Sequence, residues 1–239
     1  MIPVEICIDC SNLDAALASA SAAKEGGASR IECCAHMESG GLTPEVEIVK
    51  QIVEAVGMEV EILVMIRPRE GNFDYSPAEI LQMLESISSM AAAGAHGVVL
   101  GAVRDGTVDG RNLETLTLRA TDCNLSITFH RAYDALSDPA KAIEALKAMD
   151  IDRILTSGMT WGDASSALFG IRGLNQTLSK AGDAVEIVVG GGISAGNASA
   201  IQNQLIAEGK RSFHAFSSVL KDALTDTALV ADLVRNLNE

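Results

Sequence analysis

The chain has 239 residues, of which 48% are hydrophobic and 3% aromatic, so it can bury an aliphatic core in one large domain or two small ones. Its formal net charge of −14 argues against a surface for nucleic acid or an anionic membrane, because such surfaces need clustered lysine and arginine. A local basic pocket remains compatible with this charge.

The sequence offers no targeting or membrane signal. No stretch approaches the roughly 20 apolar residues of a membrane span, and Met1–Glu5 lacks the basic start and apolar core of a signal peptide. Five cysteines, an odd number, occur in a chain too large to need disulfides. We therefore expect a cytoplasmic protein with reduced thiols and with neither a membrane nor a nucleic-acid partner.

Short β-branched runs alternate with helical segments along the whole chain, at a spacing of about 25–30 residues that favours parallel strands. The expected strands are Val4–Asp9, Arg30–Cys34, Glu59–Ile66, Gly97–Val103, Leu125–His130, Arg153–Thr156, Glu186–Val189 and Ser212–Phe216. The expected helices are Leu13–Glu25, Thr43 to about Val56, Ser76–Ala93, Arg111–Ala120, Pro139–Met149, about Asp163 to Ala181, Ala195–Leu205 and Asp226–Leu237.

This alternation predicts a (β/α)8 TIM-type barrel formed by a single α/β domain, residues 1–239. No Pro/Ser-rich linker or shift of composition divides the chain. An open doubly wound sheet would give the same local pattern. However, Gly190-Gly191-Gly192 does not match the Gly-x-Gly-x-x-Gly fingerprint of dinucleotide-binding sheets.

Several expected strands carry polar residues on the face that would point into the barrel. The fifth strand is the clearest case, because Ser126, Thr128 and His130 alternate with Leu125, Ile127 and Phe129. A buried polar row is costly unless its members are partnered. It therefore indicates either an internal hydrogen-bonded network or a binding site.

The same alternation selects the inward residues of the other strands. They are Glu5, Cys7 and Asp9; Glu32 and Cys34; Leu63, Met65 and Arg67; Ile154 and Thr156; and His214 and Phe216. We expect Glu5, Glu32, Arg67 and His130 to cluster, with Arg67 and His130 as partners of the two carboxylates. This cluster is either catalytic or a salt-bridge network that fixes strand register.

Two features at the strand ends indicate an anion site. Arg67 and Arg69 flank Pro68, and guanidinium groups match carboxylate or phosphate geometry. Gly190–Gly192 and Ser217-Ser218 stand where many barrels hold a phosphate. The alternative is that these glycines only form a tight turn.

The cysteines allow two interpretations. Cys7-Ile8-Asp9-Cys10 has Cys-x-x-Cys spacing, but its first cysteine lies within a strand, unlike thioredoxin-type redox motifs. Cys7 and Cys34, on neighbouring strands, suit Cu(I) as two soft thiolates, whereas zinc wants four nitrogen or sulfur ligands. The alternative is that buried cysteines act as small hydrophobic residues.

Eight motifs in this order resemble the CutC copper homeostasis protein family. They are Glu5-Ile6-Cys7, Arg30-Ile31-Glu32-x-Cys34, Gly40-Gly41-Leu42-Thr43-Pro44, Met65-Ile66-Arg67-Pro68-Arg69, Asn72-Phe73-x-Tyr75-Ser76, Thr128-Phe129-His130-Arg131-Ala132-Tyr133-Asp134, Leu155-Thr156-Ser157-Gly158 and Gly190-Gly191-Gly192-Ile193. The resemblance implies a cytoplasmic TIM-type barrel, usually oligomeric, with a copper role. The two cysteines proposed for Cu(I) in the family match Cys7 and Cys34.

The chain departs from the family pattern at two motifs. His214 is followed by Ala215-Phe216 before Ser217, where the family usually has a serine closely after the histidine. Arg69-Glu70-Gly71-Asn72 replaces the common Arg-Gly-Gly-Asp, with Asp74 as a replacement carboxylate. The loop before the last helix is also shorter than usual in the family.

The resemblance predicts a copper homeostasis protein that binds Cu(I) through Cys7 and Cys34. The alternatives are a metabolite-binding module or a barrel enzyme acting on a small anionic or sugar-like metabolite, with Glu5, Glu32, His130 and Arg67 as catalytic residues. The expected ligand- or anion-binding residues are Arg69, Asp74, Tyr75, Arg131, Asp134, Thr156, Gly191, Gly192 and His214. We also expect a homo-oligomer, a dimer or larger.

Overall fold

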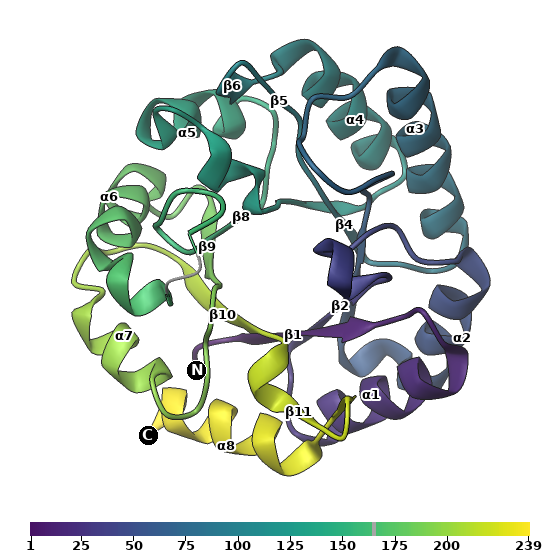
Figure 1. Ribbon diagram of the computed structural model, residues 1–239, viewed down its shortest axis with the longest axis vertical. Coiled ribbons are helices and arrows are strands. Elements are labelled where there is room, and N and C mark those ends of the chain that lie inside the picture. The colour runs from purple at the N-terminus through teal and green to yellow at the C-terminus, as the bar shows by residue number, and fades with distance from the viewer. Residues whose placement is uncertain (164–165) are drawn as a thin grey trace.

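Eight parallel strands form a closed barrel in the computed structural model, which describes residues 1–163 and 166–239 (Figure 1). The barrel strands are β1 Val4–Asp9, β2 Arg30–Cys34, β3 Glu61–Met65, β4 Gly97–Leu100, β7 Ser126–Phe129, β8 Arg153–Thr156, β9 Glu186–Val189 and β10 Arg211–Ala215. Strand β1 pairs with both β2 and β10, and this pairing closes the cylinder. The predicted TIM-type barrel is confirmed.

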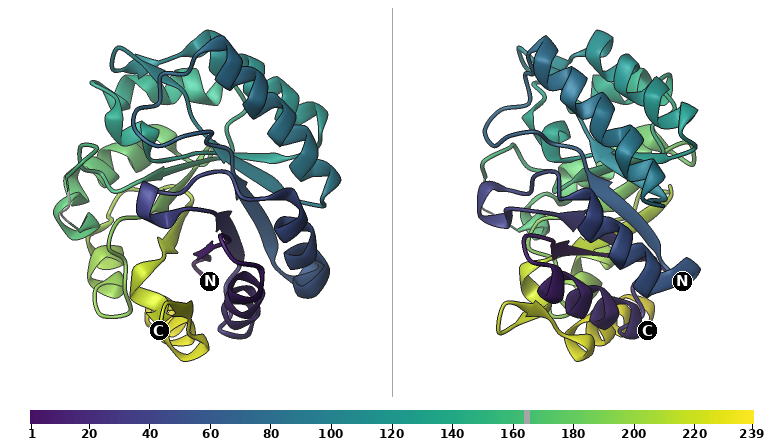
Figure 2. Two further views of the ribbon diagram at one scale, coloured as in Figure 1. Left: turned by 45° about the vertical axis from the view of Figure 1, so that its right-hand side comes forward. Right: turned by 90° about the vertical axis from the view of Figure 1, so that its right-hand side faces the viewer.

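A helix follows each barrel strand and packs in an outer ring around it (Figures 1 and 2). The helices are α1 Leu13–Glu25, α2 Val46–Val56, α3 Pro77–Ala92, α4 Gly110–Asp122, α5 Pro139–Lys147, α6 Ile171–Ala181, α7 Ala198–Gln204 and α8 Thr227–Asn238. Two small ribbons, β5 Val103–Arg104 with β6 Thr107–Val108 and β11 Leu220–Lys221 with β12 Leu224–Thr225, extend from loops. No helix in the described residues is long and apolar enough to cross a membrane.

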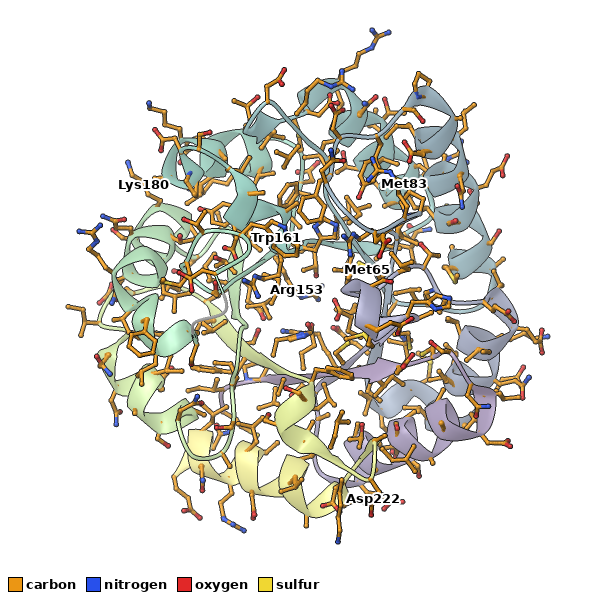
Figure 3. All side chains as sticks on the ribbon, in the orientation of Figure 1. Met65, Met83, Arg153, Trp161, Lys180 and Asp222 are labelled. Carbon is orange, nitrogen blue, oxygen red and sulfur yellow. The ribbon has the colours of Figure 1, made fainter. Side chains whose placement is uncertain are left out.

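The alternation of side chains along the strands creates two cores. The outer core lies between barrel and helices and contains Ile6, Ile8 and Ile31, each fully buried. Burying each such side chain contributes roughly 1.5–3 kcal/mol. The inner core contains Cys7, Cys34, Leu63, Met65 and Val99. Figure 3 shows Met65, Arg153 and Trp161 toward the centre of the ring and Lys180 and Asp222 at its edge.

Helix α2 begins later than predicted, at Val46 rather than after an N-cap at Thr43. The Thr43 hydroxyl is used elsewhere, because it accepts from the Arg67 backbone N–H at 2.8 Å and donates to the Arg67 carbonyl at 3.1 Å. These bonds join the loop after β2 to the loop after β3. They fix the backbone of Arg67 at the mouth of the barrel.

The predicted helix from about 163 to 181 is also shorter, because α6 begins at Ile171 after a 3-10 turn, Ala167–Phe169. Residues 164 and 165 of that prediction lie outside the described residues. The segment before α6 packs backbone against backbone, since a Cβ added at Gly170 would lie 1.9 Å from the Ser157 carbonyl oxygen.

Candidate functional site

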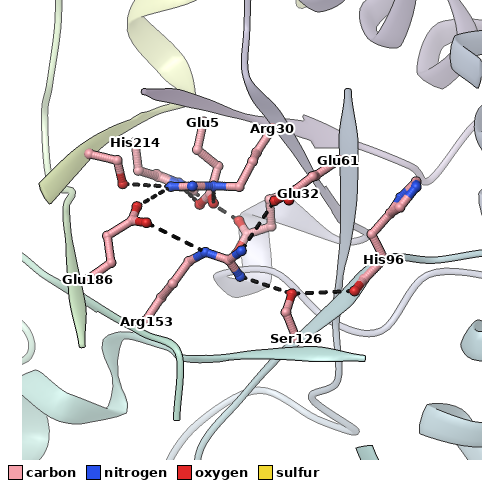
Figure 4. Close-up of polar contacts among 10 residues, drawn as sticks. Glu5, Arg30, Glu32, Glu61, His96, Ser126, Arg153, Glu186 and His214 are labelled. Atoms are coloured by element: carbon pink, nitrogen blue, oxygen red, sulfur yellow. Dashed lines mark hydrogen bonds and ion pairs between the residues drawn. The ribbon is translucent and has the colours of Figure 1, made fainter. Parts of the chain in front are cut away.

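Charged side chains form a network across the barrel interior, toward the amino-terminal ends of the strands (Figure 4). The Arg30 guanidinium lies 3.0 Å from Glu5 Oε2, 2.6 Å from Glu186 Oε1 and 2.6 Å from Ser212 Oγ. On the other side, Arg153 donates to Ser126 Oγ at 3.0 Å and to Glu61 Oε2 at 3.2 Å. Neither arginine was predicted from the sequence to face the barrel interior.

Glu5 and Glu32 are both buried, but their hydrogen-bonding partners differ from those predicted. His214 Nδ1 lies 2.8 Å from Glu5 Oε1, and its Nε2 lies 3.8 Å from Glu32 Oε2. The expectation that Arg67 and His130 pair with these carboxylates is wrong. Arg30 and His214 take that place because they flank Glu5 in register on the two neighbouring strands.

The ion pairs set the protonation of this group. Burial opposes ionisation of Glu5, but His214 and Arg30 outweigh it and lower the pKa of Glu5 to about 2. Burial raises the pKa of Glu32, and the Glu5 charge adds to that effect against the attraction of His214. Burial would lower the pKa of His214, but Glu32 and Glu5 raise it above its usual value. Glu5 is therefore the ionised carboxylate.

A cavity of about 250 Å³, here called the mouth cavity, lies above this network. It brings together Cys7, Glu32, Cys34, Arg67, His130, Arg131 and His214, with Met37, Gly40, Gly41, Met65, Phe73, Leu155 and Trp161 completing its lining. Of the four candidate catalytic residues, Glu32, Arg67 and His130 line it and Glu5 lies beneath. A wider groove of about 600 Å³ adjoins it and shares Gly40, Arg67, Phe73 and Trp161.

Arg67 is 3% exposed and is held by backbone carbonyls. Its Nη1 donates to the carbonyls of residues 39, 40 and 41 at 3.0–3.2 Å, and its Nη2 donates to that of Gly71 at 3.0 Å. Its guanidinium carbon lies 5.2 Å from the centre of the Phe73 ring. Within residues 1–163 and 166–239, no carboxylate pairs with Arg67 and its Nε has no hydrogen-bond partner.

His130 lines the cavity and carries a single ring N–H. Its Nδ1 accepts from the Ala132 backbone N–H at 3.1 Å, so the ring proton lies on Nε2. Burial, assisted by the Arg67 charge, lowers the pKa of His130 to about 3, and the ring is neutral. Its buried Nε2 finds no partner in the described part of the chain.

Residues with sulfur atoms also line the cavity. The Cys7 and Cys34 sulfurs and a Glu32 carboxylate oxygen lie within 4.8 Å of one another. Cys7 Sγ lies 3.9 Å from Met37 Sδ, and Cys34 Sγ lies 3.5 Å from Glu32 Oε2. A hydrogen bond from Cys34 favours the Cys7 thiolate, but burial and Glu32 outweigh it and raise the pKa of Cys7 to about 12. The contact with Cys7, followed by burial, raises the pKa of Cys34 as well. Both are thiols at neutral pH.

Three of the expected ligand-binding residues instead stabilise the loop after β3. Arg69 pairs with Glu79 at 2.5 Å and donates to the Asp74 carbonyl at 2.7 Å. The Asp74 carboxylate pairs with Arg104 at 2.9 Å. The Tyr75 ring lies beneath the Arg69 guanidinium, and burial raises the pKa of Tyr75 to about 12 against the opposing charges of Arg67 and Arg69. None of Arg69, Asp74 and Tyr75 lines the mouth cavity, although Asp74 lines the adjoining groove.

Arg131 and Asp134 form a buried ion pair beside the cavity. Asp134 also accepts from the Thr156 hydroxyl, which lies on the helix side of β8. The prediction that Ile154 and Thr156 face the barrel interior is therefore wrong, because Ile154 packs in the outer core. Arg153 and Leu155 take the inward positions, where Arg153 joins the charged network and Leu155 lines the cavity.

Gly191 and Gly192 lie at a second, smaller pocket of about 170 Å³, with Arg131 and His214 in its wall. Both glycines have positive φ angles, 103° and 66°. A Cβ at Gly191 would lie 2.9 Å from the Ser157 Cβ, so close packing as well as the turn requires glycine. Phe216 also lines this pocket and packs on the inner core.

Comparison with known proteins identifies the family. The CutC family model matches residues 2–216. A family protein CutC of Vibrio atlanticus is 40% identical over 201 residues, which cover 84% of this chain and 76% of the relative. The copper homeostasis protein cutC homolog of Homo sapiens is 35% identical over 221 residues, 92% of this chain and 75% of the relative.

Solved structures agree with the sequence comparison. A CutC structure from Streptococcus agalactiae superposes with a TM-score of 0.78 at 28% identity, covering 90% of this chain and 98% of that one. Tryptophan synthase subunit alpha from Legionella pneumophila superposes over 99% of this chain and 93% of its own with a TM-score of 0.67, but at 14% identity it shares the fold alone. The protein therefore belongs to the CutC family.

Proposed function

We propose that this protein is a copper homeostasis protein that binds Cu(I) between Cys7 and Cys34. Relatives at 35% identity carry the copper homeostasis name, including the human homologue. The observation that carries the proposal is the sulfur cluster, defined as Cys7, Cys34 and Met37. Its thiols and a Glu32 oxygen lie within 4.8 Å of one another, with the thioether 3.9 Å from Cys7.

The donor set favours Cu(I) over zinc. Thiolate and thioether sulfurs are the soft ligands that Cu(I) prefers, and Cu(I) accepts few of them in a buried site. Zinc prefers four ligands in a tetrahedral site. Around the sulfurs the described residues group Cys7, Cys34 and Glu32 as possible ligands, whereas His214 belongs to a separate group with Glu5 and Glu32. A set of four nitrogen or sulfur ligands is therefore not assembled at the sulfurs in this part of the chain.

Binding of Cu(I) by these thiols releases protons. Thiolates are the metal ligands, whereas burial and the nearby Glu32 keep Cys7 and Cys34 protonated. The Cu(I) charge offsets one of the thiolate charges that form. The proposal therefore requires that Cu(I) affinity rise with pH.

Competition with a coloured Cu(I) chelator under anaerobic conditions tests the proposal. We expect one Cu(I) per chain, and a loss of affinity of at least about 100-fold in the variant Cys7→Ser/Cys34→Ser. Cys123→Ser is the matched control, because Cys123 lies at the end of α4, outside the mouth cavity. A folded double variant that binds Cu(I) as tightly as the parent would overturn the proposal.

A further inference from the structure

The mouth cavity contains hydrogen-bonding groups that a sulfur site for copper does not use. Arg67 Nε and His130 Nε2 are buried donors, and Glu32 Oε1 is a buried oxygen. None of the three has a partner at hydrogen-bond distance in the described residues, although the Tyr75 hydroxyl, which is also without one, interacts with Arg67. Buried polar atoms without partners are rare in folded proteins and call for an explanation. We propose that this cavity also binds a small hydroxylated carboxylic acid, with its carboxylate on Arg67 and His130 and a hydroxyl on Glu32.

Arg67 is a buried cation that no carboxylate among the described residues neutralises. The side chain is 3% exposed, and its bonds go to uncharged carbonyls of the loops after β2 and β3. Arg131, in the same wall, is neutralised by Asp134. A buried cation without a counter-ion is strongly destabilising. An anionic ligand would supply the counter-ion that the described residues do not provide for Arg67.

The orientation of the His130 ring is fixed by a backbone hydrogen bond. The Ala132 N–H holds the ring of this cavity-lining residue through Nδ1, so Nε2, which has no partner in the described residues, carries the N–H whether or not a ligand is present. The Phe73 ring contacts both donors, since its centroid lies 5.0 Å from that of His130 and 5.2 Å from the Arg67 guanidinium carbon. The two donors thus flank one aromatic ring, in the manner of a preorganised oxyanion site.

Glu32 would hold the hydroxyl end of the ligand. Glu32 Oε2 contacts Cys34 and lies near His214, whereas the buried Oε1 has no hydrogen-bond partner among the described residues. A ligand hydroxyl would complete the bonding of this oxygen. The volume of about 250 Å³ is near the lower limit for ligand pockets, which favours an acid of a few carbon atoms. The apolar lining, Met65, Phe73, Leu155 and Trp161, suits its carbon chain.

Calorimetric titration with matched compounds tests this proposal on the unaltered protein. Glycerate and gluconate are the acids, glycerol and sorbitol lack the carboxylate, and propionate and hexanoate lack the hydroxyls. We expect at least one acid to bind about 10-fold more tightly than both of its matched compounds, because each of them loses a hydrogen bond. The proposal is wrong if neither acid binds more tightly than its matched polyol and fatty acid.

Variants then locate the bound acid. His130→Leu should weaken binding about 10-fold or more, and His130→Gln, which keeps an N–H donor, should recover part of the loss. His36→Leu is the control, because His36 is exposed and outside the cavity. Cys7→Ser/Cys34→Ser should keep acid binding while losing Cu(I), which separates this inference from the copper proposal. A folded His130→Leu protein with unchanged affinity contradicts the assignment. If that variant unfolds, the ligand series above still decides.

Discussion

Glu5 and Arg30 lie directly opposite each other on β1 and β2 and form a buried ion pair, with 3.0 Å between Arg30 Nε and Glu5 Oε2. His214 on β10 lies opposite Glu5 on the other side. Glu5 is thus enclosed by cross-strand partners and does not line the mouth cavity. This enclosure favours a positioning role for Glu5, which holds His214 beside Glu32.

Breaking this ion pair should destabilise the barrel strongly. Arg30→Met leaves a buried carboxylate with one fewer partner, and we expect a loss of about 3–5 kcal/mol in the free energy of unfolding. Urea denaturation measures the change. Arg235→Met, which removes an exposed pair with Asp232, is the control and should cost less than about 1 kcal/mol. A loss of similar size in both variants would contradict the structural role of Arg30.

Acid should destabilise the protein in two steps. The folded pKa of His130, about 3, lies below its ordinary 6.5, so on acidification the unfolded chain takes up this proton first and stability falls between these values. Glu5 adds a second loss from pH 4.5 toward its folded pKa of about 2. Each group contributes a slope of at most about 1.4 kcal/mol per pH unit.

The variant His130→Gln separates the two steps. It removes the ring that titrates, so its free energy of unfolding should fall less steeply than that of the parent between pH 6.5 and 4.5. Urea denaturation across this range gives both slopes. Equal slopes would mean that His130 titrates normally in the folded protein and would refute its neutral, buried assignment.

The thioether of Met37 should contribute to Cu(I) affinity. Met37→Leu keeps the volume of the side chain and removes the sulfur, so we expect roughly 10-fold weaker binding with little change in stability. Met58→Leu is the control, since Met58 is exposed and distant from the cavity lining. Chelator competition gives both affinities, and equal values would remove Met37 from the sulfur cluster.

Gly101 controls the position of His130. A Cβ at this position would lie 2.8 Å from two atoms of the His130 ring, so Gly101→Ala must displace the ring. We expect about 10-fold weaker binding of the hydroxy acid by calorimetry. Gly110→Ala, where the nearest atom outside the local backbone is 3.6 Å away, should leave binding unchanged. Unaltered affinity in Gly101→Ala would show that the ring orientation does not matter.

The barrel could be predicted from the sequence because strands alternate with helices along the chain and aliphatic residues occupy every second position of most strands. Four strands, β1, β2, β8 and β9, have the predicted bounds. Parity failed on β8, where Ile154 and Leu155 are equally apolar and therefore do not distinguish the two faces of the strand. Arg30 could have been found, because it shares the parity of Glu32 and Cys34 on β2.

The residues of the cavity could be predicted only in part. Which acceptor a charged side chain contacts depends on the direction in which the folded backbone points it, and residue type does not show this direction. Arg67 and Arg69 look equivalent in the sequence. Arg67 turns into the mouth cavity, where Thr43 fixes its backbone, whereas Arg69 turns outward to Glu79. Likewise, the sequence cannot show that the Ala132 N–H occupies His130 Nδ1 and thereby fixes the proton on Nε2.

The most direct test of the copper proposal is a crystal of the protein loaded anaerobically with Cu(I), with anomalous differences measured on both sides of the copper absorption edge. The account predicts one copper peak per chain, bonded to the sulfurs of Cys7 and Cys34. A peak confined to surface residues such as His36, with none in the mouth cavity, would contradict it.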